Sequence, residues 1–505
     1  MEGETVLSQY TLESDGIVAD VIIRRVPGMS VPQYFVNLPN IDEGTYALLK
    51  SLRIELIREI PEKIQQLSTG GTDQQKQEFL DLVITKLQSL LPNLTEETYR
   101  SLAGTLFHEM FGLGEIEVID SDDNLEDIVV NNSKTNVLVY HRKFGWLETN
   151  LRIDEEEKIE NYAEQIARRV GRQITILNPL LDAQLLNGDR VNATLFPIST
   201  KGNTIDIRKF RAEPWTLVDF LQNKTISAEA AAFLWQAIEY ELSFIVTGGT
   251  ASGKTSLLNV LIGFIPPNQR IITIEDTEEL VLPKFLHWVP LLTRQPNAEG
   301  KGEVTMLDLL VNSLRMRPDR LVVGEIRRRE EAETLFEALM TGHSVYATMH
   351  AETAQQIVNR LLSDPINLPE IEVASLDLIV TAFRQRRLGI RRVLEVAEVE
   401  EAMSAGKVEL RVNNLFQWKA RTDTIEKSLS PSVKVQSKIE LYSGLTASEI
   451  QDDLNQKLKV LNWMVRHKLP NLESIGLVLN DYYIFKDRLL DAVEKDLDFQ
   501  AVQRL

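Results

Sequence analysis

The chain has 505 residues, of which 43% are hydrophobic and 26% charged, a composition typical of soluble globular proteins with roughly two to four domains. Its 74 acidic residues outnumber its 55 basic residues, and the net charge of −19 argues against broad non-specific binding to nucleic acid. Cysteine is absent, which excludes disulfides and thiolate zinc sites. The start is acidic and polar, and no apolar run approaches the roughly 18 residues of a membrane span, so we expect a cytosolic protein.

Residues 1–112 are predicted to form a mostly helical domain after a short β-rich start. Two early segments, VADVIIRR and QYFVNLP, have strand character. Apolar residues then recur at helical spacing over 42–67 and 74–91, and Thr95 is a candidate N-cap for a further helix. We find no catalytic constellation in this region.

Residues 113–215 are predicted to form a small α/β domain. Short strands are indicated by IEVID, DIVVN, NVLVYH and WLETNLRI. A helix rich in polar residues, expected over 155–170, interrupts them. We interpret RKFRAEPW, residues 208–215, as the linker that ends this domain.

Apolar strands alternate with helices over 216–405. The strand candidates are FIVTG, RIITIED, DRLVVGE, SVYATMH, LDLIVTAF and RRVLEVAEV. Such alternation predicts a mostly parallel sheet covered by helices, so the expected fold class is α/β. Residues 406–505 are expected to be a mainly helical C-terminal extension, in which Thr446 and Glu449 form a capping box.

A phosphate-binding loop is predicted directly after the apolar strand FIVTG. Residues 248–255, GGTASGKT, match the pattern G-x-x-x-x-G-K-[ST]. Lys254 would add a charge for the β and γ phosphates, and Thr255 would offer a hydroxyl to Mg²⁺. A helix expected over 254–265 would point its positive end at the same anion. The residues expected to bind the nucleotide are Gly248, Gly249, Thr250, Ala251, Ser252, Gly253, Lys254, Thr255 and Ser256.

Acidic residues follow two later apolar strands. Glu275 and Asp276 end one strand, and Glu325 ends another after Gly324. Carboxylates at the carboxyl ends of parallel strands line the crevice where ligands bind, and a phosphate loop needs such groups to hold Mg²⁺ and orient water. Acidic residues also end strands for purely structural reasons, but the loop upstream favours the functional interpretation.

Two of the six histidines flank one predicted strand. His343 precedes the strand SVYATM and His350 follows it. This arrangement suggests a nucleotide-facing role for at least one of them. Capping or a surface hydrogen bond is the structural alternative.

Taken together, GGTASGKT, IEDTEEL, LVVGEI and TGHSVYATMHA resemble the phosphate loop (Walker A), Asp box, atypical Walker B and His box of the secretion and type IV filament ATPases. Residues 178–210, with DAQLLNGDRVNA followed by a strand that ends IRKF, resemble the N-terminal domain of that superfamily. The flanking regions and the missing zinc-binding cysteines are closer to its archaeal branch, which includes pilus and archaellum motors. The resemblance covers about residues 122–400 and implies a RecA-like core that binds ATP and Mg²⁺.

The resemblance implies roles for the loop and the carboxylates. Lys254 and Thr255 would bind phosphate and Mg²⁺. Glu325 would act as base or orient the attacking water, and it would belong with Thr255 and Asp276 to the Mg²⁺ site, directly or through water. Glu275 would support Mg²⁺ and water from the facing strand.

The resemblance also implies roles for histidines and arginines. His343 and His350 would report the γ-phosphate to the sheet. Arg190, Arg208 and Arg294 would place positive charge against the γ-phosphate at domain closure, because guanidinium groups bind phosphate oxygens bidentately. One position departs from the family pattern, since Arg328 stands where glycine or aspartate is usual.

Members of this superfamily form hexameric rings that work with a polytopic membrane platform protein and pilin-like subunits. The leading hypothesis is therefore an ATP hydrolase on the cytoplasmic face of the membrane that drives assembly of a type IV pilus-like filament or protein secretion. An archaellum motor shares all the motifs, and a DNA-transfer ATPase is disfavoured by the acidic composition. A small-molecule kinase would leave the extra domains unexplained, and Lys254 and Glu325 disfavour a scaffold without turnover.

Overall fold

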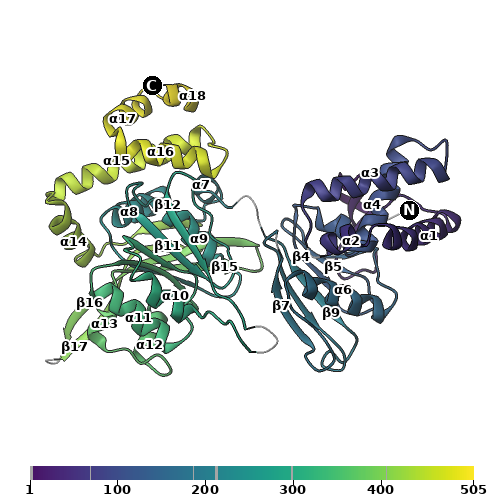
Figure 1. Ribbon diagram of the computed structural model, residues 1–505. Coiled ribbons are helices and arrows are strands. Elements are labelled where there is room, and N and C mark those ends of the chain that lie inside the picture. Colours follow the sequence, from purple (N-terminus) through teal and green to yellow (C-terminus); the bar gives the residue numbers. More distant parts are fainter. Residues whose placement is uncertain are drawn as a thin grey trace. The chain divides into compact units, whose positions relative to one another are not determined.

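The computed structural model of the chain describes residues 4–68, 70–185, 187–210, 214–296, 300–404 and 407–504. They divide into two compact units, Met1–Arg211 and Ala212–Leu505, which are treated separately below (Figure 1). The linker expected over 208–215 lies partly outside the described residues. The further boundaries expected near 112 and 405 stay predictions.

The first unit is built on a nine-stranded sheet with the order β1-β2-β3-β6-β5-β4-β9-β8-β7. Neighbouring strands are antiparallel except β3 and β6, which pair in parallel. The strands are β1 (Thr5–Ser14), β2 (Ile17–Arg25), β3 (Gln33–Asn37), β4 (Leu125–Val130), β5 (Leu138–His141), β6 (Gly145–Thr149), β7 (Leu180–Gln184), β8 (Arg190–Thr194) and β9 (Thr204–Arg208).

The early strands and the later ones share this sheet and its core. Asp122 is buried and lies between the two groups of strands in the sequence. It accepts hydrogen bonds from the hydroxyls of Tyr10 at 2.5 Å and Tyr34 at 2.8 Å. Burial and the neighbouring carboxylate raise the pKa of both tyrosines, so both hydroxyls keep their protons and remain donors. The β-rich start is thereby joined to the strands that begin at Leu125.

The helices described in this unit are α1 (Glu43–Glu59), α2 (Pro61–Ser68), α3 (Asp73–Leu90), α4 (Glu96–Phe111), α5 (Glu115–Asp120) and α6 (Glu156–Arg169). Thr95 is the N-cap of α4, as expected. The strand expected at IEVID was wrong, because these residues form α5. Ile116 and Ile119 are three residues apart, so a helix places both on the face that is buried in the core.

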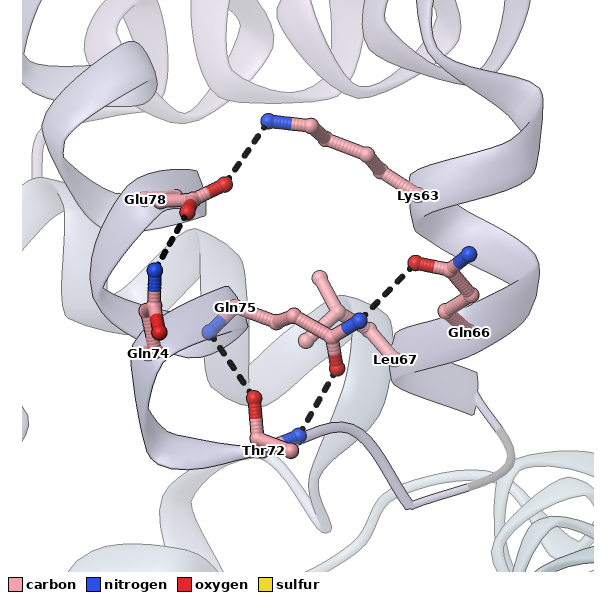
Figure 2. Close-up of a pocket in the computed structure, with 7 residues that line it drawn as sticks. All are labelled: Lys63, Gln66, Leu67, Thr72, Gln74, Gln75 and Glu78. Atoms are coloured by element: carbon pink, nitrogen blue, oxygen red, sulfur yellow. Dashed lines mark hydrogen bonds and ion pairs between the residues drawn. The ribbon is translucent and has the colours of Figure 1, made fainter.

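A polar cavity of about 330 Å³ lies between α2 and α3, and Figure 2 shows the residues that line it. Lys63 forms an ion pair with Glu78 at 3.0 Å across its mouth. Gln75 donates to Gln66 at 2.9 Å and closes the capping box with Thr72 that begins α3. The polar groups of the cavity are therefore paired with one another, which indicates a junction between two helices.

The second unit is also built on a nine-stranded sheet, with the order β12-β11-β13-β14-β10-β15-β16-β17-β18. The six strands from β12 to β15 in this order are parallel, and the last three continue the sheet antiparallel. They are β10 (Phe244–Gly248), β11 (Arg270–Glu275), β12 (His287–Leu292), β13 (Arg320–Val323), β14 (Ser344–Met349), β15 (Leu378–Gln385), β16 (Ile390–Ser404), β17 (Lys407–Lys419) and β18 (Thr424–Lys427).

Helices cover both faces of this sheet, which explains why its inner parallel strands are mostly apolar. One face carries α10 (Met306–Ser313), α11 (Arg329–Met340), α12 (Ala354–Leu362) and α13 (Glu370–Val373). The other carries α7 (Leu217–Gln222), α8 (Ala228–Glu239), α9 (Lys254–Ile262) and the C-terminal helices. The helix expected over 254–265 ends at Ile262, with Gly263 as its C-cap.

The C-terminal region adds a helical layer to the same core. It contains α14 (Lys434–Ser443), α15 (Ala447–Arg466), α16 (Leu472–Ile484), α17 (Lys486–Glu494) and α18 (Phe499–Arg504). The capping box of Thr446 and Glu449 begins α15 as expected, and Trp463 of α15 is buried in the core that includes Trp235 of α8. The fold class is confirmed: a RecA-like α/β core with further N-terminal elements and a helical C-terminal extension (Figure 1).

Within the described ranges, no helix combines the length and the apolar character that crossing a membrane requires. Over the same residues, we find no group of three or more His, Cys, Asp or Glu side chains able to hold a metal ion by themselves.

Candidate active site

The phosphate-loop pattern lies between the parallel strand β10 and the helix α9. At Gly248 φ is +153°, and a Cβ there would lie 2.3 Å from the carbonyl oxygen of Ala382 and 2.4 Å from Oγ of Ser252. Gly253 has φ +90° and is the N-cap of α9 in the left-handed conformation. The backbone path therefore requires both glycines of the pattern.

The loop and the first turn of α9 offer donors for an anion. The Oγ atom of Ser252 is buried and has no hydrogen-bond partner among the described residues. Residues 249–251 complete the loop, and Lys254, Thr255 and Ser256 form the first turn of the helix. Backbone N–H groups in a first turn have no partner within the helix, and together with the helix dipole they form a binding site for phosphate.

A hydrogen-bonded chain connects the loop lysine to a carboxylate on another strand. Nζ of Lys254 lies 3.2 Å from Nδ1 of His350, and Nε2 of His350 lies 2.9 Å from Oε1 of Glu325. Burial and the nearby Lys254 ammonium lower the pKa of His350, which favours a neutral ring that accepts from Lys254 and donates to Glu325. Burial also lowers the pKa of Lys254, although the nearby Glu325 acts to raise it.

Arg327 joins this chain to a second carboxylate. Its Nη2 lies 2.6 Å from Oε2 of Glu325, and its Nη1 lies 2.6 Å from Oδ2 of Asp276. The other carboxylate oxygen of Asp276 accepts from the hydroxyl of Thr293 at 3.0 Å. Lys254, His350, Glu325, Arg327 and Asp276, which we call the charged cluster, thus connect the ends of β10, β14, β13 and β11.

Glu275 lies beside the charged cluster but faces the protein interior. It is buried at the end of β11 and accepts backbone N–H groups of Glu279 at 3.1 Å and Leu280 at 3.2 Å. Burial raises the pKa of Glu275 to about 8, although these hydrogen bonds act in the opposite direction. At neutral pH this carboxyl group is therefore mostly protonated, and the neighbouring Asp276 is the residue that contacts Arg327.

The turn after Glu325 is fixed by a carboxylate from the next helix. Oε2 of Glu331 accepts the backbone N–H groups of Arg327 at 2.9 Å and Arg328 at 3.0 Å. Arg328, which departs from the family pattern, is the residue that precedes α11. Its backbone takes part in the turn, and the charged cluster uses the side chain of Arg327 instead.

The structure does not bring His343 to the charged cluster. His343 lies at the opposite end of the six-residue strand β14, about 23 Å from His350 at the usual rise per residue. Its Nδ1 lies 3.2 Å from the carbonyl oxygen of Ala338 and 3.3 Å from Oγ1 of Thr341, at the end of α11. The two histidines thus lie at opposite ends of β14, and His343 contacts the end of α11. The expectation that His343 and His350 both report the γ-phosphate to the sheet stays a prediction.

Arg294 lies beyond the edge strand β12 and is exposed. Its Nε donates to the carbonyl oxygen of Gly302 at 2.6 Å, and its backbone forms an antiparallel bridge with Val304. Arg294 does not contact the charged cluster itself, but its chain neighbour Thr293 contacts Asp276 of that cluster.

Arg190 and Arg208 lie in the first unit, on neighbouring strands. They are Cα partners in the antiparallel pair β8–β9, so their side chains leave the same face of the sheet. Arg208 contacts Asp127 at 3.1 Å, and Arg190 lies 4.0 Å from Asp182. The structure therefore brings these two predicted residues together.

Two arginines near the loop were missed by the sequence analysis. Arg327 was not singled out as a site residue. Arg391 on β16 donates from Nε to the carbonyl oxygen of Ala251 in the loop at 3.3 Å. A run of basic residues after an acidic strand end was a signal for Arg327. Nothing in the sequence connects residue 391 with residue 251, because their contact depends on the position of β15 and β16 beside β10.

Comparisons with known proteins identify the family of the chain. Residues 147–421, more than half of the chain, match the family model described as Type II/IV secretion system protein. The chain is 35% identical over 412 residues to an uncharacterized protein of Methanocaldococcus jannaschii (MJ0900), which covers 80% of this chain and 72% of that protein. It is 32% identical over 326 residues to a putative conjugal transfer protein of Mycobacterium tuberculosis, which covers 62% of this chain and 90% of that protein.

Among solved structures, the VirB11 ATPase from the Brucella suis type IV secretion system, in complex with sulphate, is 26% identical, with a TM-score of 0.29. The match covers 55% of this chain and 89% of that one. The extent of the family match decides the classification. The chain belongs to the type II/IV secretion system protein family.

Proposed function

We propose that the chain is an ATP-hydrolysing motor that powers assembly of a type IV pilus-like filament or secretion of a protein across the cytoplasmic membrane. The observation that carries the proposal is the chain of contacts from Lys254 through His350 to Glu325. It links a loop suited to phosphate with a carboxylate at the end of a neighbouring strand. Family membership supports the same conclusion.

Each group near the loop would have a separate task. Residues 248–256 would bind the phosphates through backbone N–H groups, with Lys254 adding its charge. Glu325 would orient or deprotonate the attacking water. His350, in contact with both Lys254 and Glu325, would signal the presence of the γ-phosphate to β14.

The residues near the loop fit a magnesium ion that is held mainly by the nucleotide. Mg²⁺ usually keeps several waters and takes only one or two carboxylates from the protein, together with phosphate oxygens. The Thr255 hydroxyl and the carboxylates of Asp276 and Glu325 are a donor set of this kind. The two carboxylates already share a cationic partner in Arg327, which supports a site for positive charge between them. Glu275 would support the Mg²⁺ site indirectly, by fixing the position of the backbone next to Asp276.

Arginines away from the loop would complete the site when the protein assembles. Arg190, Arg208 and Arg294 are proposed to neutralise the γ-phosphate at closure, as guanidinium forks suit phosphate oxygens. Assembly as a homo-hexamer would place six such sites in a ring. Hydrolysis would then release the arginines and allow the units to move.

The motor would lie on the cytoplasmic face of the membrane and act on a polytopic platform protein and pilin-like subunits. Archaellum assembly or rotation is the first alternative, since it would use the same site. Conjugative DNA transfer is a second alternative, favoured by the similarity to a putative conjugal transfer protein but not by the net charge of −19.

The experiment that tests the proposal compares steady-state ATP hydrolysis and ATP binding in wild type and Glu325→Gln. Loss of turnover with binding retained would support the role of Glu325. The control is Glu333→Gln, which removes an exposed carboxylate on α11 that pairs only with Arg329 among the described residues. Equal hydrolysis by wild type and Glu325→Gln would overturn the assignment, and failure of the wild-type protein to bind ATP would overturn the function.

A further inference from the structure

The β15–β16 hairpin runs alongside the phosphate loop. β15 pairs with β10 as far as Gly248, opposite Ala382. From the returning strand β16, Nε of Arg391 donates to the carbonyl oxygen of Ala251 at 3.3 Å. A Cβ on Gly253 would lie 3.5 Å from Cδ of Arg391, so the arginine stem lies in van der Waals contact with the second half of the loop.

The guanidinium group of Arg391 has N–H donors without a partner among the described residues. Among the described residues, the Ala251 carbonyl is the only partner of this side chain, and Nε makes that bond, so Nη1 and Nη2 are uncommitted. The adjacent Arg392 differs, because it is buried and forms a bidentate pair with Asp423 at 2.7 and 2.8 Å. Arg391 is half-buried and carries a permanent charge without a carboxylate partner.

A free guanidinium fork beside a loop of backbone N–H groups is suited to phosphate oxygens. The position of Arg391 also indicates which phosphates it would reach. In loops of this pattern the backbone cradles the α and β phosphates, and the lysine reaches the β and γ phosphates. Arg391 contacts the loop at Ala251 and Gly253, whereas Lys254 and His350 define the γ side.

We infer that Arg391 is a nucleotide-binding residue that holds the diphosphate common to ADP and ATP. This inference rests on the proposed function, because the nucleotide site itself is proposed there. Arg391 would set how firmly nucleotide is retained through the whole cycle, independently of the γ-phosphate. His350 and Glu325 would distinguish ATP from ADP, and Arg391 would not.

The test compares the full-length variants Arg391→Gln and Arg387→Gln. Arg387 is an exposed residue in the turn of the same hairpin, so its replacement makes the same charge change away from the loop. Binding of a fluorescent ADP and of a non-hydrolysable ATP analogue is measured for each, together with kcat and KM for ATP. For Arg391→Gln we expect both affinities to fall by about tenfold, the usual value of a charge-assisted hydrogen bond, with kcat at saturating ATP nearly unchanged. Arg387→Gln should bind like wild type.

Competition with pyrophosphate and with adenosine identifies the part of the nucleotide that Arg391 contacts. Pyrophosphate should lose affinity in Arg391→Gln and adenosine should not. Arg391→Lys should recover part of the loss, because it restores the charge but not the fork, and it also serves if the glutamine variant folds poorly. Unchanged ADP affinity, a loss confined to the ATP analogue, or a loss confined to adenosine would each overturn the inference. Wild-type protein that binds no nucleotide would overturn the proposed function instead.

Discussion

The guanidinium group of Arg327 bridges Asp276 and Glu325, with Nη1 and Nη2 each 2.6 Å from one carboxylate oxygen. Two acidic groups at the ends of different strands are thus held together by a cation that belongs to the chain. A Mg²⁺ ion brought by ATP would meet the same two carboxylates. Arg327 would therefore compete with the ion while it orients Glu325 for catalysis.

We predict that Arg327→Gln lowers the Mg²⁺ concentration needed for half-maximal ATP hydrolysis by severalfold, because the carboxylates lose their competing cation. The same change should reduce kcat by about tenfold or more, because Glu325 is no longer oriented. A Mg²⁺ titration of steady-state hydrolysis measures both effects.

Arg329→Gln is the control for this experiment. Arg329 lies two residues further along and pairs with Glu333 at the surface. An unaltered Mg²⁺ dependence in Arg327→Gln would show that the bridge does not compete with the ion.

Glu275→Gln should change how the stability of the nucleotide-free protein depends on pH. Burial raises the pKa of Glu275 from 4.5 to about 8, so the folded protein holds a proton that the unfolded chain releases. The contribution of Glu275 to the free energy of unfolding is therefore fully present below pH 4.5, and it is lost as the pH rises toward 8. Glutamine cannot ionise and accepts the same backbone N–H groups, so the variant should gain stability over wild type at alkaline pH.

Thermal unfolding at pH 5 and pH 9 measures the difference, which we expect to reach the order of a few kcal/mol at the higher pH. Glu278→Gln, at a less buried position on the same loop, is the control. Parallel pH profiles for wild type and Glu275→Gln would mean that Glu275 ionises normally.

The sequence analysis predicted the inner parallel strands because their apolar runs are buried on both faces, and it missed the largely exposed edge strand β12. FIVTG coincides with β10, and β11, β13 and β14 lie within the expected segments. The helix α5 and the strands β17 and β18, which begin the extension expected to be mainly helical, were not predicted, because tertiary neighbours decide the structure of such segments. Isoleucine and valine suggested a strand at α5, but the core required their helical spacing.

The charged cluster was predictable in part. Motif order predicted that Lys254, Glu325 and His350 would lie together, and their distances agree with that expectation. His343 was grouped with His350 because the two flank one strand and match the His box, and the structure places them at opposite ends of β14. Arg391 could not be found in this way, because only the pairing of β10 with β15 brings its hairpin to the loop.

Asp453→Asn should destabilise the second unit, because Asp453 is the centre of a buried network. It contacts the fully buried Lys457 and accepts from Lys486 at 2.8 Å and from Gln236 at 2.8 Å. Burial alone would raise the pKa of Asp453, but the two lysines outweigh it and hold the pKa well below the usual range. At pH 7 we expect a loss of about 3 kcal/mol, because the buried Lys457 keeps only Glu239 as a charged partner among the described residues and Lys486 loses its ion pair.

The sign of the pH effect follows from the lowered pKa of Asp453. Its contribution is present above the unfolded value of 3.8 and is lost as the pH falls below it, so wild type and Asp453→Asn should converge in acid. Urea unfolding at pH 7 and pH 3 measures this. Asp452→Asn, at the exposed neighbouring position, should unfold like wild type at both pH values. A loss for Asp453→Asn that is equally large at pH 3 would contradict the electrostatic explanation.

Arg190→Gln should separate function from stability in the first unit. Arg190 and Arg208 face each other across β8 and β9, and like charges directly opposite destabilise a sheet. Asp182 lies 4.0 Å from Arg190 and is exposed, so this ion pair is too weak to compensate for the repulsion between the two arginines. We therefore expect the unfolding free energy to stay within about 0.5 kcal/mol of wild type or to rise slightly.

ATP hydrolysis by the same variant should fall by about tenfold or more if Arg190 supplies charge to the γ-phosphate. Arg152→Gln, which removes an exposed arginine paired with Asp154 in the same unit, should change neither quantity. Urea unfolding and steady-state hydrolysis on the same preparations measure both. A fall in activity that follows a fall in stability would assign Arg190 to the structure of the sheet, and full activity at wild-type stability would remove it from the site.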